Sequence, residues 1–139
     1  MMRFRMTKIN VGQFALLLSE MPTGEIRIHI DMDLKYSLEM KRIMVSMLFT
    51  FEIDDHKAML LQLNCEFEIA AEDWNAAISD GKLTIPKEII EYFGAQTIGV
   101  SRGVLHCKTE GTPFNGIILP PINVSDLVKE DLVISPVDS

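Results

Sequence analysis

The chain has 139 residues, 47% of them hydrophobic, and its 13 basic and 20 acidic side chains give a net charge of −7 with neutral histidines. This length is typical of one domain, so we expect a single domain over residues 1–139. The apolar content excludes an intrinsically disordered chain, which has few apolar residues. The negative charge argues against nucleic acid as a partner, because phosphate binding relies on Lys and Arg.

The cysteine content and the lengths of the apolar runs indicate in which cellular compartment the protein resides. Cys65 and Cys107 are the only cysteines, too few for a disulfide scaffold, which favours a reducing compartment. No apolar run reaches the roughly 18–20 residues of a membrane helix, and residues 14–18 are shorter than a signal core of about 7–15. We therefore expect a cytoplasmic protein without membrane insertion. Its mean hydropathy of +0.17 indicates a large core or apolar surface left for partners.

The clearest pattern in the chain is a period-2 alternation over residues 25–38, which sends apolar side chains to one face of a strand. Residues 42–53 and 59–69 repeat it, and residues 3–18 show it less regularly. Polar opposite faces favour an antiparallel sheet. Short connections predict that the second, third and fourth strands are neighbours in a meander. The predicted apolar face comprises Ile43, Val45, Met47, Phe49, Phe51, Ile53, Met59, Leu61, Leu63, Cys65, Phe67 and Ile69.

A helix is predicted after the strands. Residues 84–88, Thr-Ile-Pro-Lys-Glu, indicate its start, because proline suits the first helical turn. Residues 111–113, Gly-Thr-Pro, indicate its end. Three small residues recur at every fourth position and predict a smooth face that another backbone could approach closely: Ala95, Gly99 and Gly103.

The remaining segments are less regular. Residues 70–82 are polar and turn-rich, and residues 114–122 indicate an extended loop. A last short helix is expected over residues 126–132, capped by Asn123 or Ser125. Strands followed by helices are typical of an α+β fold.

The ionisable and nucleophilic residues form no recognisable catalytic or metal-binding set. His106-Cys107 is the only adjacent pair of His and Cys residues, and no second pair stands at a zinc-like spacing. Cys65 lies on the apolar face of its strand, where a core thiol is expected. Asp31 and Asp33 lie on a polar strand face, where carboxylates are solvated. We therefore expect no enzymatic activity, no metal site and no cofactor.

Two segments between residues 98 and 127 resemble the SecB family of export chaperones. In that family a helix ends in a Val-Ser-Arg-Gly segment, and Val100-Ser101-Arg102-Gly103 stands in that place here. An apolar stretch with proline, a branched residue and asparagine follows in the family, as Pro121-Ile122-Asn123 does here. Ile85-Pro86 matches a proline near the start of the family's helix. Residues 25–30 are similar to the family's second strand. The order of the elements agrees over nearly the whole chain.

The resemblance implies a four-stranded antiparallel sheet with a long helix and a short C-terminal helix packed on one face. It implies a homotetramer, built as a dimer of dimers, that holds unfolded polypeptides without ATP and serves protein export together with the secretion motor. Apolar grooves would bind the client. Five side chains would line the client groove by position: Ile26, Ile28 and Ile30 on the strand, with Val124 and Leu127 on the last helix.

Three other functions stay open. The family's acidic docking surface for the secretion motor cannot be matched residue by residue in this sequence, and residues 106–116 resemble an insertion relative to the family. A SecB-like chaperone with other clients, such as the antitoxin of a toxin–antitoxin pair, is therefore one alternative. A non-catalytic adaptor subunit with a single partner is another. A hot-dog thioesterase also wraps a long sheet about a helix, but that fold places its helix before most of its strands, contrary to the order here.

Overall fold

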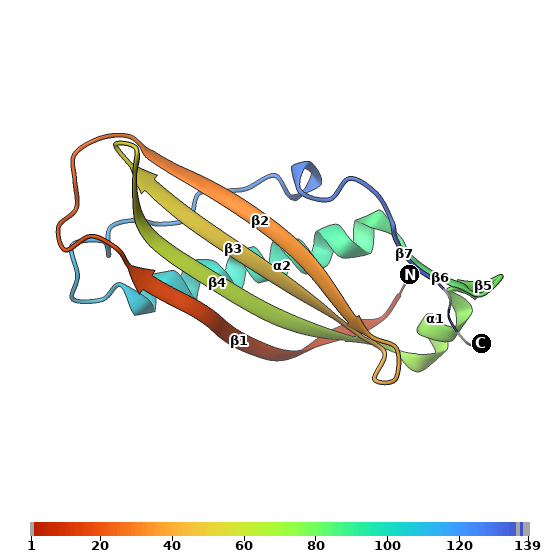
Figure 1. Ribbon diagram of the computed structural model, residues 1–139. Coiled ribbons are helices and arrows are strands. Elements are labelled where there is room, and N and C mark those ends of the chain that lie inside the picture. Colours follow the sequence, from red (N-terminus) through yellow and green to blue (C-terminus); the bar gives the residue numbers. More distant parts are fainter. Residues whose placement is uncertain (1, 136, 138–139) are drawn as a thin grey trace.

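The main layer of the molecule is a four-stranded antiparallel sheet (Figure 1). The computed structural model describes residues 2–135 and 137. The predicted meander of the second, third and fourth strands is confirmed, and the first strand pairs with the fourth, so the first two strands form the edges. The order is β1-β4-β3-β2, with the bounds β1 Phe4–Leu16, β2 Ile26–Ser37, β3 Arg42–Ile53 and β4 His56–Ile69.

One face of this sheet carries the core. In β3 and β4, every predicted apolar position is buried, from Ile43 at one end to Ile69 at the other. At the alternate positions of these two strands, which face the other side of the sheet, most side chains are half-buried. The alternation therefore identified the core face correctly, because the pleat of a strand sends successive side chains to opposite faces.

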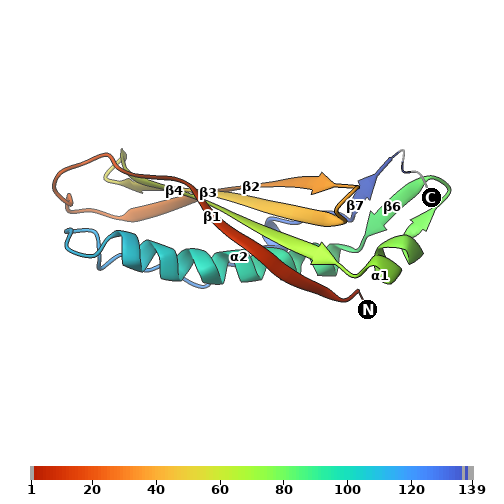
Figure 2. The ribbon, with the colours of Figure 1, turned by 90° about the horizontal axis from the view of Figure 1, so that it is seen from below.

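The long helix α2 (Lys87–Lys108) lies along the core face of the sheet (Figure 2). It begins directly after Pro86, as predicted, and ends before Gly111. Three of its buried or terminal hydroxyls, on Thr97, Ser101 and Thr109, donate to the carbonyl four residues earlier. These groups are therefore satisfied within the helix although they face the core. No helix in the described part of the chain has the length and apolar content needed to cross a membrane.

An aromatic cluster joins α2 to the sheet. The rings of Phe67 on β4 and Phe93 on α2 stack with centroids 4.2 Å apart and an interplanar angle of 11°. Phe4 on β1 meets Phe93 edge-on at 4.8 Å. Phe67 and Phe93 are fully buried, so the cluster fixes the helix against two strands at once.

A second, small sheet lies at the end of the molecule where α2 begins (Figure 1). Residues 70–82, expected to be turn-rich, contain a short helix, α1 (Ala71–Ala76), and β5 (Ile78–Ser79), and β6 (Lys82–Ile85) follows just before α2. The third strand is β7 (Leu132–Ile134), which pairs with β6. The sequence analysis did not predict these elements.

The expected C-terminal helix over residues 126–132 is wrong. Asn123 does act as a cap, since its Oδ1 accepts from the Ser125 N–H at 3.2 Å, but it caps only the 3₁₀ helix η1 (Val124–Asp126). The chain then extends into β7. Pairing with β6 accounts for this difference. The backbone N–H and C=O groups of Leu132–Ile134 find hydrogen-bond partners in β6, a strand that is distant in the sequence, and so do not need a helix.

Asp131 gives a second reason for the extended chain. The N-cap position of α2 is Pro86, which supplies no side-chain cap. Asp131 Oδ1 accepts from the Lys87 N–H at 2.7 Å, so this carboxylate caps the helix from another segment. A negative charge at a helix N-terminus is favourable, and this contact holds the C-terminal segment in place.

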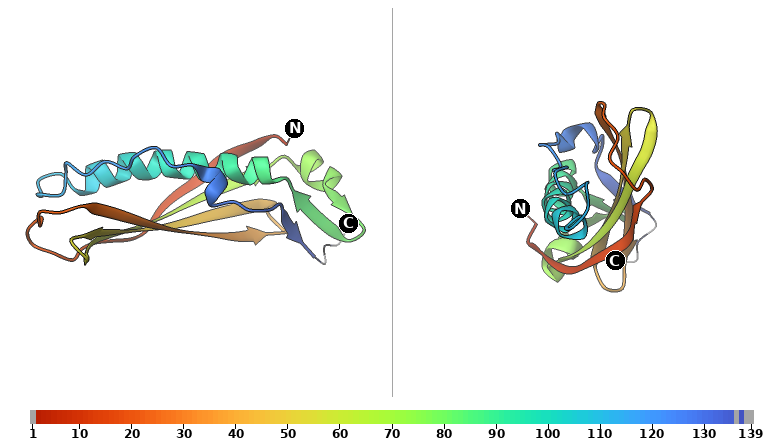
Figure 3. Two further views of the ribbon diagram at one scale, coloured as in Figure 1. Left: turned by 90° about the horizontal axis from the view of Figure 1, so that it is seen from above. Right: turned by 90° about the vertical axis from the view of Figure 1, so that its left-hand side faces the viewer.

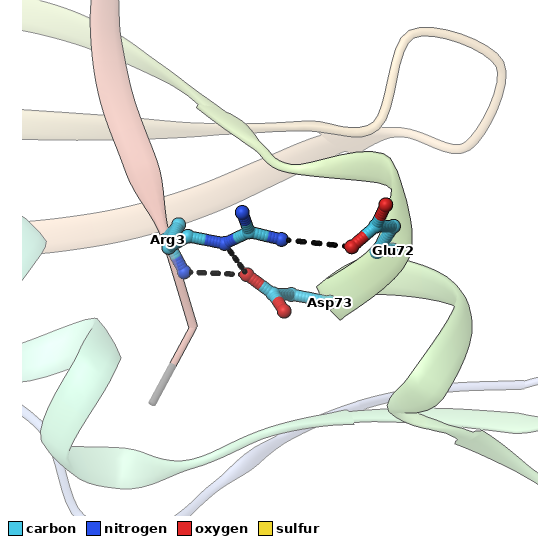
Figure 4. A network of polar contacts seen from close by, with 3 residues as sticks. All are labelled: Arg3, Glu72 and Asp73. Atoms are coloured by element: carbon cyan, nitrogen blue, oxygen red, sulfur yellow. Dashed lines mark hydrogen bonds and ion pairs between the residues drawn. The ribbon is translucent and has the colours of Figure 1, made fainter.

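A polar network ties the start of β1 to α1 (Figure 4). The backbone N–H of Arg3 and its Nε both donate to Asp73 Oδ2, at 2.8 and 3.0 Å, and its Nη2 lies 3.2 Å from Glu72 Oε2. The two hydrogen bonds from Arg3 hold the pKa of Asp73 below its usual value. The network therefore anchors the first strand beside the small sheet.

Candidate functional site

The segment of residues 114–128, the crossover segment, returns along α2 from the end of the helix toward its start (Figure 3). Phe114, Ile117 and Leu119 are buried and anchor its first half. Arg102 on α2 donates through Nε to the Leu119 carbonyl at 2.8 Å and through Nη2 to the Pro120 carbonyl at 3.2 Å. The crossover segment is therefore fixed to the helix by packing and by one arginine.

The second half of the crossover segment packs closely against α2 at Gly94. A Cβ atom at Gly94 would lie 2.8 Å from Val124 Cγ1 and 3.6 Å from Met32 Cε. At Gly99 and Gly103, a Cβ atom would meet no described atom within 4 Å. Among the described residues, nothing therefore packs closely onto Gly99 or Gly103, and the close contact occurs at Gly94 instead, with the side chain of Val124.

An apolar groove of about 250 Å³ lies between β2, the start of α2 and the C-terminal segment. Its walls combine Met32 and Leu34 of β2 with Ile90 of α2. Leu127, Val128 and Leu132 supply the opposite wall, and three charged residues, Lys129, Glu130 and Asp131, complete the lining at its rim. We call this cavity the apolar groove; it brings together side chains from three separate parts of the chain.

The five predicted client-binding residues lie on the two segments that flank this region. Leu127 lines the apolar groove, whereas Val124 packs beside Gly94, near Met32, and is not part of the lining. The three isoleucines lie on β2 before Met32, with Ile28 and Ile30 half-buried and Ile26 37% exposed. They continue the apolar row of β2 but do not line the apolar groove itself.

Sequence reasoning missed part of the apolar groove. Met32 and Leu34 extend the alternation of the three isoleucines, so the pattern already contained the signal for them. Ile90 lies among apolar residues that recur at roughly helical spacing in the predicted helix, so the sequence also contained a signal for it. Leu132 had no local signal, because it reaches the apolar groove only through the pairing of β7 with β6.

We expect Arg102→Met to loosen the crossover segment while leaving the sheet intact. Hydrogen bonds from a charged group contribute about 1.5–3 kcal/mol, so hydrogen exchange of the buried Ile117 amide, which bonds to the Phe114 carbonyl, should accelerate roughly tenfold or more. Lys108→Met, at the exposed end of the same helix, is the matched control. Equal exchange rates in both variants would contradict the tethering role of Arg102.

The residues that could carry other chemistry lie apart. Cys65 is buried, and desolvation raises the pKa of its thiol against a smaller opposing effect of a hydrogen bond with Thr97. His106 and Cys107 are exposed near the end of α2. Within the described ranges, His, Cys, Asp and Glu form no group of three or more that could hold a metal ion.

Comparison with known proteins identifies the fold. No protein-family model matches the sequence, and no curated protein matches it. Among solved structures, the chain is similar to the Mycobacterium tuberculosis Rv1957 SecB-like chaperone in complex with a ChAD peptide from the Rv1956 HigA1 antitoxin. The TM-score is 0.57 at 8% sequence identity, over 87% of this chain and 91% of that chain. The chain therefore has a SecB-like fold, which confirms the resemblance found in the sequence at the level of the fold.

Proposed function

We propose that this protein is a SecB-like holding chaperone that binds non-native polypeptides without ATP and without catalysis. The observation that carries the proposal is the apolar groove beside β2, an edge strand whose apolar row is only half-buried. The SecB-like fold supports the same function. The five predicted residues, Ile26, Ile28, Ile30, Val124 and Leu127, are proposed to contact the client together with Met32 and Leu34.

A small number of shallow apolar contacts suits reversible binding of a client. Burial of one aliphatic client side chain contributes roughly 1.5–3 kcal/mol. Part of this gain is lost in ordering an unfolded segment. A few shallow contacts of this kind therefore hold a client and still release it without an energy source.

We further propose that the protein is a cytoplasmic homotetramer, a dimer of dimers. Apolar side chains on the outer surface support an assembly of several copies. Tyr92 on α2 is 49% exposed and Ile9 on β1 is 51% exposed. Met44, Leu48 and Leu60 remain half-buried on the face of the sheet opposite α2. The two free cysteines favour a reducing compartment.

Two client classes fit this proposal. Exported proteins are the clients implied by the resemblance to the SecB family, with delivery to the secretion motor. An antitoxin is the second candidate, favoured by one observation: the structurally similar Rv1957 chaperone binds a peptide from the HigA1 antitoxin.

Light scattering tests the holding function. We expect the protein, without ATP, to suppress the aggregation of a chemically denatured protein on dilution, and added ATP to change nothing. No suppression at several-fold molar excess would refute the proposal. Capture of a single folded protein without any suppression would favour the adaptor function instead.

A further inference from the structure

The face of the large sheet opposite α2 carries basic side chains at the end where β1 begins and β2 ends. Strand pairing aligns two rows of side chains across all four strands, in the order β1, β4, β3 and β2. The rows comprise Lys8, Glu66, Met44 and Lys35, and then Arg5, Glu68, Arg42 and Ser37. We call these two rows the basic patch. Its cations outnumber its carboxylates by four to two, although the whole chain carries a net charge of −7.

The ion pairs within the basic patch leave two lysines free. Glu68 lies between two arginines, with its carboxylate oxygens 2.9 Å from Arg5 Nη2 and 3.6 Å from Arg42 Nη2. Lys8 and Lys35 are exposed and form no ion pair within the described residues. Both ammonium groups can therefore pair with an acidic partner.

The rest of this face is not basic. The next two rows toward its centre contain one charged side chain each, Asp33 and then Asp31, both exposed on β2. Farther along, His29 Nε2 lies 3.3 Å from Glu52 Oε2, and Lys57 also lies opposite Glu52. Arg27 shares a hollow with four carboxylates, those of Glu25, Glu52, Asp54 and Asp55. An acidic segment is therefore attracted to the basic patch and not to the far end of the face.

Two hollows lie side by side in the basic patch, and Met44 and Glu66 line both of them. The first has a volume of about 160 Å³ and is completed by Lys35, Tyr36, Ser37 and Arg42. The second has a volume of about 120 Å³ and is completed by Lys8, Asn10 and Asn64. The surface between the cations is therefore indented and can receive side chains.

One lining residue of each hollow has a buried polar atom without a partner. Arg42 Nε, a donor, and Asn64 Oδ1, an acceptor, form no hydrogen bond within the described part of the chain. Buried polar groups in native structures are nearly always paired, so such atoms indicate a missing partner. A polypeptide with acidic side chains supplies both kinds of partner, carboxylate acceptors and backbone N–H donors.

We propose that the basic patch binds an acidic segment of a partner protein, extended across the strands. Lys8 and Lys35 lie in one row on the two edge strands, three strand spacings or roughly 14 Å apart. In an extended chain, residues four positions apart share a face and are roughly 13 Å apart. Two acidic residues at this spacing therefore reach both lysines, and the residue midway between them lies over Met44. This site is separate from the apolar groove, which lies on the α2 side of the sheet.

The charge of the whole chain distinguishes a short acidic segment from a nucleic acid. A long polyanion would extend beyond the basic patch and meet the acidic remainder of a surface whose net charge is −7. A segment of a few residues stays within the two rows of the basic patch. The acidic peptide segment is therefore the partner that fits.

Methionine methyl NMR on the full-length protein tests the proposal. With carbon-13 in the methionine methyl groups, Met44 reports on the basic patch, and Met32, in the apolar groove, is the internal control. The probe is a nine-residue peptide with glutamate at its third and seventh positions, valine at the fifth and threonine elsewhere. The matched control peptide has glutamine in place of glutamate.

We expect the glutamate peptide to shift the Met44 signal and not the Met32 signal, and the glutamine peptide to shift neither. The double variant Lys8→Gln/Lys35→Gln should bind the glutamate peptide about three- to thirtyfold more weakly, as the loss of two exposed ion pairs implies. Lys57→Gln, at an exposed lysine of the same sheet, should leave its affinity unchanged. Glu66→Gln should tighten binding, because it removes the unpaired carboxylate of the basic patch.

Three results would overturn the proposal. Both peptides shift Met44 equally, neither shifts it at millimolar concentration, or inorganic phosphate alone reproduces the shift, which would assign the basic patch to small anions. Native mass spectrometry of Lys8→Gln/Lys35→Gln provides a further check. A smaller assembly than that of the unmodified protein would show that copies of this chain occupy the basic patch, and would also overturn the proposal.

Discussion

Leu127→Asp is expected to raise the concentration needed for half-maximal suppression of aggregation by roughly 10- to 100-fold. Leu127 lines the apolar groove, and loss of one aliphatic contact with the client costs about 1.5–3 kcal/mol. A carboxylate at position 127 replaces an apolar contact with a charge beside Glu130 and Asp131, which already line the groove, and adds the cost of its desolvation when a client binds. Light scattering at increasing chaperone concentration measures the effect.

A methionine pair provides the matched control for this prediction. Met32 lines the apolar groove, whereas Met40 is 51% exposed in the turn between β2 and β3. Met32→Asp should therefore weaken holding as Leu127→Asp does, and Met40→Asp, with the same change of charge, should not. Circular dichroism confirms that each variant is folded. Equal activity of the folded Met32 and Met40 variants would contradict the role of the apolar groove.

Phe93→Ala is expected to lower the free energy of unfolding by about 3–5 kcal/mol, as truncation of a large buried aromatic side chain does. Phe93 is fully buried and contacts both Phe67 and Phe4, so its removal opens a cavity between α2 and two strands. Domains of this size are stable by only about 5–15 kcal/mol. Urea denaturation followed by circular dichroism measures the change.

Tyr92→Ala is the comparison for Phe93→Ala. Tyr92 precedes Phe93 in α2 and also meets the ring of Phe4, at 5.4 Å, but it is 49% exposed. Its truncation removes an aromatic contact without creating a closed cavity, so the loss of stability should be clearly smaller. Equal losses for the two variants would show that Phe93 does not hold the two layers together.

The apolar groove depends on the stability of the C-terminal segment. Leu132 forms part of its wall, and β7 holds Leu132 through its pairing with β6. Asp131 attaches the same segment to the first turn of α2. The apolar groove therefore lies between the large sheet on one side and, on the other, a segment fixed by few contacts, so its shape depends on those contacts.

Local patterns in the sequence were sufficient to identify the large sheet and the long helix. The alternation in β3 and β4 specifies their buried face because successive side chains of a strand point to opposite faces of the sheet. The apolar face can therefore be identified from neighbouring residues alone. Pro86 marks the start of α2 because its missing N–H costs nothing in the first helical turn. The alternation placed the isoleucines of β2 on one face of a strand, as the structure has them, whereas their client-binding role was implied only by the resemblance to the SecB family and stays a prediction.

Contacts between distant segments decided the rest. A capping residue, Asn123, correctly marked a helical turn, but pairing with β6 and the bond from Lys87 to Asp131 drew the following residues into a strand. Gly94, rather than Gly99 or Gly103, receives the crossover segment because the path of that segment depends on the packing of the whole chain. The apolar groove itself joins residues from 32 to 132, and no local pattern in the sequence can encode contacts over that separation.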